Sequence, residues 1–146
     1  MPAIQDDLQE LADEFDTLGE WEERYRYVIE LGKALAPLTD AERSVANKVR
    51  GCASQVWLVT EPQGDGTVRF RGDSDAHIVS GLIAILLRLY SGRAPAEILT
   101  FDAKAAFEAL GLTGALSSQR SNGLASMVGR IRCDAEALSQ AGHTSA

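Results

Sequence analysis

The 146-residue sequence is poor in the side chains that build metal sites and disulfide frameworks. It holds two cysteines, Cys52 and Cys133, and two histidines, His77 and His143. Structural zinc and iron–sulfur clusters usually need four Cys or His ligands, and no CxxC, HxxH or CxxH spacing occurs here. Asp73 and Asp75 alternate with His77, but carboxylates at the start of a helix are usually caps. We therefore expect no metal and no bound cofactor.

Positive charge and long apolar runs are also scarce. The chain has 14 basic against 21 acidic residues, a net charge of −7, which argues against binding to nucleic acid or to an anionic membrane. The longest apolar stretch, 78–90, is interrupted by Ser80, Gly81 and Arg88 and is shorter than the roughly 20 residues of a membrane span. The N-terminus has neither the basic nor the apolar region of a signal peptide. Two cysteines fit a reducing cytoplasm best, so we expect a cytoplasmic protein.

A hydrophobic content of 45% indicates a globular chain, and its length suits one domain over 1–146. Apolar residues at helical spacing predict an amphipathic N-terminal helix over 2–18 and a second helix from Trp21 to about Leu35, before Pro37. Residues 40–43 resemble a short helical turn. No linker or internal repeat divides the chain, and the small, polar tail 141–146 is expected to fray.

The middle of the chain changes to a strand pattern. Residues 56–59 and 67–71 are separated by the turn signal 63–66, which predicts an antiparallel hairpin, with 48–50 as a short third strand. Helices are then expected over 76–91, which is apolar nearly all round, over 96–99 and 103–110, and from Ser121 or Asn122 to about Leu138. This order predicts an α+β fold in which several helices pack against a three-stranded antiparallel sheet.

Cys52 follows Gly51 on the loop between the residues 48–50 and the strand that starts at Val56. A glycine permits a sharp backbone turn that presents the sulfur at a tip, which suits a thiolate that must react with another molecule. Free cysteines are also often buried and inert. Position alone leaves these two interpretations evenly balanced.

The residues around Cys52 resemble the SufE family, which includes CsdE-type proteins. The segment 51–57, GCASQVW, matches the family signature GCxSQVW. Further matching motifs run in the same order along the chain and cover roughly residues 20–138: 21–25, 29–32, 72–76, 78–79, 81–84, 101–102 and 118–124. Several collinear motifs over most of a chain are a strong signal, whereas one alone would be weak.

This resemblance implies a SufE/IscU-like fold and a non-enzymatic role in iron–sulfur cluster assembly. Cys52 would accept a persulfide sulfur from a pyridoxal-phosphate cysteine desulfurase of the SufS/CsdA type, stimulate that enzyme, and pass the sulfur to a scaffold or another acceptor. Gly51, Ser54, Gln55 and Asp75 would form the loop and contact the partner. Arg120 precedes a helix whose first amides favour anions, so it would stabilise the thiolate or persulfide, or contact the desulfurase; the alternative is an arginine that pairs with acidic surface groups.

The remaining candidates have weaker support. Cys133 would be a resolving thiol or a bystander; nine residues after Leu124 it falls opposite the apolar stripe of the last helix, which favours the bystander. His77 at a helix start and His143 in the tail are more readily structural than catalytic. The alternative function is an independent thiol transferase or hydrolase, which would need a base aimed at Cys52. A pure binding module, indifferent to loss of the Cys52 sulfur, is the third possibility.

Overall fold

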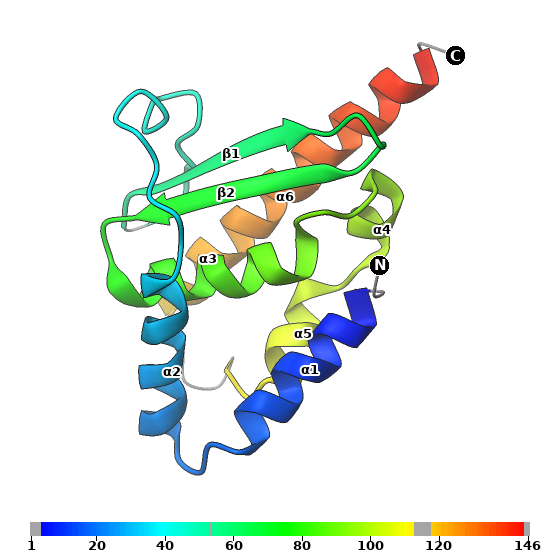
Figure 1. Cartoon of the computed structure of the whole chain (residues 1–146). Helices are drawn as coiled ribbons and strands as arrows, with labels where there is room; N and C mark the ends of the chain where they lie inside the picture. The colour runs from blue at the N-terminus through cyan, green and yellow to red at the C-terminus, as the bar shows by residue number, and fades with distance from the viewer. Residues whose placement is uncertain (1–3, 53, 113–117, 145–146) are drawn as a thin grey trace.

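The computed structural model of the chain describes residues 4–52, 54–112 and 118–144. In chain order these form α1 (Ile4–Asp16), α2 (Trp21–Lys33), β1 (Val56–Pro62), β2 (Val68–Ser74), α3 (His77–Tyr90), α4 (Pro95–Thr100), α5 (Ala103–Ala109) and α6 (Ser118–Thr144). Figure 1 shows β1 and β2 lying side by side along α3, with α6 running behind them and α1 and α2 covering the other side of α3. The fold is a mixed α+β arrangement, as the sequence predicts.

Helix α3 is the centre of the core. Nine of its residues are buried, so its apolar composition is used on nearly every face. It crosses α2 at a contact of two glycines: a Cβ on Gly81 would lie 2.0 Å from the carbonyl oxygen of Val28, and one on Gly32 would lie 2.5 Å from the Gly81 nitrogen. Only glycine allows the two backbones to approach this closely. The contact brings α2 onto α3 on the side away from the sheet.

The sheet is a hairpin of two strands, not the three-stranded sheet that the sequence predicts. β1 and β2 pair in register from Val56↔Ser74 to Pro62↔Val68. The segment expected as a third strand makes one isolated antiparallel bridge, Lys48↔Trp57, with two flanking hydrogen bonds. A turn at 45–48 precedes the bridge and Gly51, with a φ of +91°, follows it, so the chain leaves the sheet before a ladder can extend. Three strands over the described residues were a wrong prediction.

Other boundaries differ for local reasons. Residues 39–43 form a turn in which Thr39 and Glu42 exchange backbone and side-chain hydrogen bonds in the manner of a capping box, but no helix follows. Helix α6 starts at Ser118 and continues to Thr144, beyond the apolar stripe from Leu124 to Leu138 on which the sequence prediction rests. The sequence predicts a frayed tail over 141–146, but residues 141–144 continue α6, and residues 145 and 146 lie outside the described residues. None of the described helices is long and apolar enough to cross a membrane.

Candidate functional site

Cys52 lies on the loop before β1, as the sequence predicts, and its sulfur is turned inward. The loop turns at Gly51, whose φ of +91° is a conformation that residues with a Cβ rarely adopt. The Cys52 side chain is half-buried against the core, and its Sγ donates a hydrogen bond of 3.4 Å to the carbonyl oxygen of Gly123 on α6. The thiol therefore rests against the first turns of α6.

The environment of Cys52 favours the neutral thiol. Burial raises the pKa of the Cys52 thiol, because removing the sulfur from water disfavours its charged form. The hydrogen bond to a carbonyl oxygen likewise requires the proton to be on the sulfur. A carbonyl cannot act as a general base, so this contact does not activate the cysteine for a hydrolase or transferase reaction of its own. In this conformation the charged, nucleophilic form of Cys52 is therefore disfavoured.

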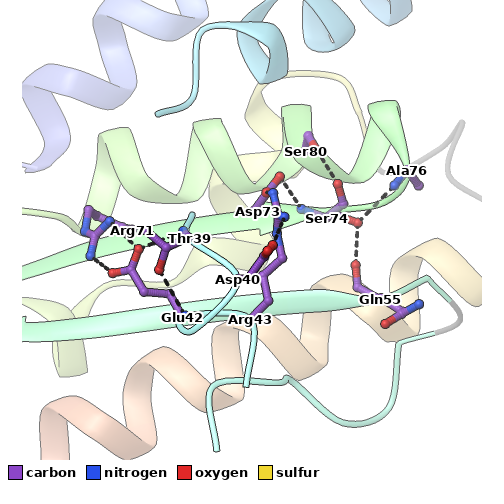
Figure 2. A network of polar contacts seen from close by, with 10 residues as sticks. All are labelled: Thr39, Asp40, Glu42, Arg43, Gln55, Arg71, Asp73, Ser74, Ala76 and Ser80. Carbon is purple, nitrogen blue, oxygen red and sulfur yellow. Dashed lines mark hydrogen bonds and ion pairs between the residues drawn. The ribbon is translucent and has the colours of Figure 1, made fainter. Parts of the chain in front are cut away.

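The downstream end of the loop is held by hydrogen bonds at Gln55, which Figure 2 shows in part. The Ser74 hydroxyl donates to the Gln55 carbonyl oxygen (2.7 Å), and the Gln55 amide donates to the Asp75 carboxylate (3.0 Å). Ser74 also accepts a hydrogen bond from the Ala76 amide at the start of α3. Asp75 and Gln55 are thus brought together at the end of the loop that joins β1. Ser54, which precedes Gln55 in the sequence, is half-buried.

The sequence did not reveal a second polar network, which fastens the segment before the loop to the hairpin. In Figure 2, Arg43 pairs with Asp73 (2.6 Å) and Arg71 pairs with Glu42. Hydrogen bonding from Arg71 lowers the pKa of Glu42 to about 2. The paired residues are about 30 positions apart, so no local pattern could have indicated them. The Asp73 carboxylate therefore joins the 39–43 turn to the hairpin.

Arg120 lies in the first turns of α6, three residues before Gly123, whose carbonyl holds the Cys52 thiol. Its guanidinium carbon is 5.9 Å from the centre of the Tyr25 ring of α2. Residues three apart on a helix are neighbours on its surface. The structure therefore brings Arg120 to the part of α6 on which Cys52 rests. Its effect on sulfur chemistry stays a prediction.

The other candidates lie apart from this site. Cys133 is exposed, and its ten-residue separation from Gly123 corresponds to about 15 Å along α6. A disulfide needs Cα atoms within about 7 Å, so Cys133 is not placed to resolve Cys52. His77 is exposed at the first position of α3, and His143 lies near the end of α6. Within 4–52, 54–112 and 118–144, no three His, Cys, Asp or Glu side chains are grouped to hold a metal.

A cleft of about 830 Å³ runs along α6 beside α4 and α5. Its described walls include Phe101, Leu124, Val128 and Arg132, and Cys52 is not among them. Leu124 follows Gly123 directly, so the cleft and the cysteine loop lie on neighbouring faces of the same helix. The candidate site is therefore the Cys52 loop, which lies outside this cleft.

Comparison with known proteins shows what the chain is similar to. The SufE family model, described as an Fe-S metabolism associated domain, matches residues 9–135. A SufE-like protein of Rhizobium etli is 57% identical over 132 residues, covering 88% of this chain and 89% of its own. One from Rhizobium meliloti is 53% identical over 132 residues, covering 88% and 94%. The solution structure of a hypothetical protein from Thermus thermophilus superposes with a TM-score of 0.75 at 18% identity, covering 92% of this chain and 96% of that one, and shows the shared fold.

Proposed function

The chain belongs to the SufE family of sulfur-transfer proteins in Fe–S metabolism, and from this premise we propose that Cys52 is its sulfur-carrying residue. Cys52 takes the sulfur from a persulfide on a pyridoxal-phosphate cysteine desulfurase, stimulates that enzyme by clearing its cysteine, and passes the sulfur to a cluster scaffold or another acceptor. The carrier needs no cofactor of its own. The observation that supports this role is a single thiol on a glycine-hinged loop, stored against α6 by one weak hydrogen bond.

The proposed transfer step is a thiol–persulfide exchange. The Cys52 thiolate attacks the terminal sulfur of the donor persulfide with its electron pair and forms a new S–S bond. The donor's S–S bond breaks, and its electron pair leaves with the donor cysteine as a thiolate. The transferred sulfur is now the terminal atom of a persulfide on Cys52, and no external oxidant or reductant is consumed. The rate of such an exchange depends on the thiolate fraction and on access to the sulfur.

Both factors require the loop to leave its resting position. Burial keeps the thiol protonated and shields it, which also protects a persulfide from reduction or oxidation by other thiols. We propose that docking on the desulfurase swings Cys52 outward, with Gly51 as the hinge and the hydrogen-bonded Gln55 as the fixed end. Asp75 and Ser54, at the fixed end of the loop, contact the partner. Arg120 stabilises the charged sulfur or also contacts the partner.

Mass spectrometry tests the identity of the acceptor. The purified protein is incubated with a cysteine desulfurase, pyridoxal phosphate and cysteine, then digested without reductant. We expect an adduct of one sulfur atom on the Cys52 peptide, its absence in Cys52→Ser, and its persistence in Cys133→Ser, since Cys133 lies apart from the site. Both variants should melt within a few degrees of the wild type. A sulfur adduct carried mainly by Cys133 would refute the assignment.

A further inference from the structure

A small positive surface lies beside the Cys52 loop in a chain whose net charge is −7. Lys48 and Arg50 flank Val49 in the segment that leads to the loop. Val49 is 3% exposed, and its amide donates a hydrogen bond to the Val56 carbonyl (2.8 Å), which turns the Val49 side chain inward. Lys48 and Arg50 are both exposed, and neither forms an ion pair within the described part of the chain. We call these two residues the basic pair.

The backbone that carries the basic pair is held by hydrogen bonds from α6. The guanidinium of Arg130 on α6 donates to the carbonyl oxygens of Ala46 (2.9 Å) and Lys48 (3.4 Å). The charge of Arg130 is balanced by Asp134, 3.2 Å away on the next turn. Asp134 also accepts a hydrogen bond from Thr60 of β1, so α6, the hairpin and this segment are joined. The two cations are therefore presented by ordered backbone, which reduces the entropy lost when a partner binds them.

The basic pair lines a groove of about 410 Å³, and Arg50 in its wall directly precedes Gly51. Its described lining residues are Val45, Ala46, Lys48, Val49, Arg50, Ser126 and Arg130, with no acidic side chain among them. Val45 stands at this groove with 79% of its surface exposed, although it is a large apolar residue. Ser126, another wall residue, also lies near Gly51, since a Cβ built on Gly51 would be 2.5 Å from the Ser126 hydroxyl oxygen. The groove and the proposed hinge therefore share a wall.

Two cations without an ion-pair partner among the described residues could act either on the Cys52 sulfur or on a partner protein. The pKa of Cys52 is raised by burial, so the resting thiol gains no net stabilisation of its charged form from its surroundings. Nucleic acid is also a poor occupant, because its binding rests on many phosphate contacts and on a broad basic face. A protein surface that carries carboxylates is complementary in charge to the two cations, and it can also cover the exposed side chain of Val45.

We propose that Lys48, Arg50 and Val45 form a docking surface for an acidic patch on the sulfur donor, placed so that its persulfide meets Cys52. The proposal rests on the function proposed above. Because the rest of the chain is predominantly acidic, an acidic patch is attracted to this position and repelled elsewhere. Such an arrangement orients the two proteins before contact and raises the rate of productive encounter, an effect that salt weakens.

Charge reversal tests the surface directly. We would measure stimulation of the cysteine desulfurase from the same genome, loaded with pyridoxal phosphate, as a function of carrier concentration. Arg50→Glu should raise the half-saturating concentration several-fold and Lys48→Glu/Arg50→Glu by about tenfold or more, as for charges that steer association. The control is Arg69→Glu, an exposed arginine opposite Glu61 at the far end of the hairpin, with the same charge change. It should leave the concentration dependence unchanged.

Salt and saturation separate this proposal from the function on which it rests. Between about 0.1 M and about 1 M salt the screening length falls from roughly 10 to 3 Å, so the difference between wild type and double variant should largely disappear. At saturating carrier the double variant should still acquire sulfur on Cys52. Equal half-saturating concentrations for wild type and double variant would overturn the docking surface while leaving the carrier role intact. Lack of sulfur uptake by the wild type would instead refute the carrier role. Loss of affinity for a single-stranded oligonucleotide, with desulfurase affinity unchanged, would also overturn the proposal.

Discussion

Replacing Gly51 by alanine should release Cys52 from its resting position. Gly51 has a φ of +91°, and a residue with a Cβ held in such a conformation costs about 1–3 kcal/mol. The new Cβ would also lie 2.5 Å from the Ser126 hydroxyl oxygen, so the Ser126 side chain would have to rotate away. Both costs apply to the closed loop, whereas an open loop can adopt another φ. The closed state is held mainly by the burial of one half-exposed cysteine and one hydrogen bond of 3.4 Å.

A penalty of about 1–3 kcal/mol corresponds to a change of roughly 5- to 150-fold in the ratio of open to closed loops. Alkylation of Cys52 by iodoacetamide in the free protein should therefore accelerate within this range at a fixed pH. It should show less additional acceleration when a desulfurase lacking its own nucleophilic cysteine is added. Adding Ser126→Ala to Gly51→Ala removes the steric conflict with the Ser126 hydroxyl and leaves the backbone strain at residue 51. The alkylation rate of Cys52 should therefore fall only part of the way back to the wild-type rate.

The matched control is Gly66→Ala in the hairpin turn. Gly66 has nearly the same φ, +88°, but a Cβ there meets nothing within 4 Å, and the turn lies at the far end of the hairpin from Cys52. This variant should lower the melting temperature without changing the alkylation rate. If Gly51→Ala instead lowers the melting temperature as much as Gly66→Ala does and leaves Cys52 equally slow, the strain is absorbed by the fold and the hinge argument is wrong.

Two further predictions concern charged residues. Hydrogen bonding from Arg71 lowers the pKa of Glu42 from 4.5 to about 2. The pair therefore stabilises the folded protein at pH values above 4.5, and this contribution is lost as the pH falls from 4.5 towards about 2. Glu42→Gln should therefore flatten the loss of thermal stability over that interval, and an unchanged acid limb would show that the pair contributes nothing. Arg120→Lys keeps the positive charge but loses the planar contact with Tyr25. If Arg120 binds the charged sulfur, Arg120→Lys should accept sulfur faster than Arg120→Ala. Equal rates of sulfur acceptance per folded molecule would instead assign Arg120 to packing.

Periodicity identified the elements whose pattern is strong and local. The all-round apolar stretch near Ile83 became the buried helix α3, and the turn signal at 63–66 joins β1 and β2 in the expected hairpin. Prediction failed where a boundary depends on distant contacts. The residues before Gly51 have the composition of a strand, yet one bridge to Trp57 is all that the surrounding turns permit. Residues 40–43 have a helix-start signal, but they are used to bind Arg71 and Asp73.

The sequence by itself determined the family, the α+β class and the position of Cys52 on a glycine-bearing loop, because these depend on motif order and on short-range backbone preference. Only the tertiary structure decided how that cysteine is stored. The Gly123 carbonyl that accepts its hydrogen bond is 71 residues away, and the Ser74 and Asp75 contacts that hold Gln55 come from another strand and its following turn. The same holds for the basic pair: the sequence shows Lys48 and Arg50 in a chain with excess negative charge, but whether each is neutralised depends on which carboxylates the fold places nearby. Burial, hydrogen bonding and ion pairing all act over a few ångströms in space, and a linear sequence does not record distances of that kind.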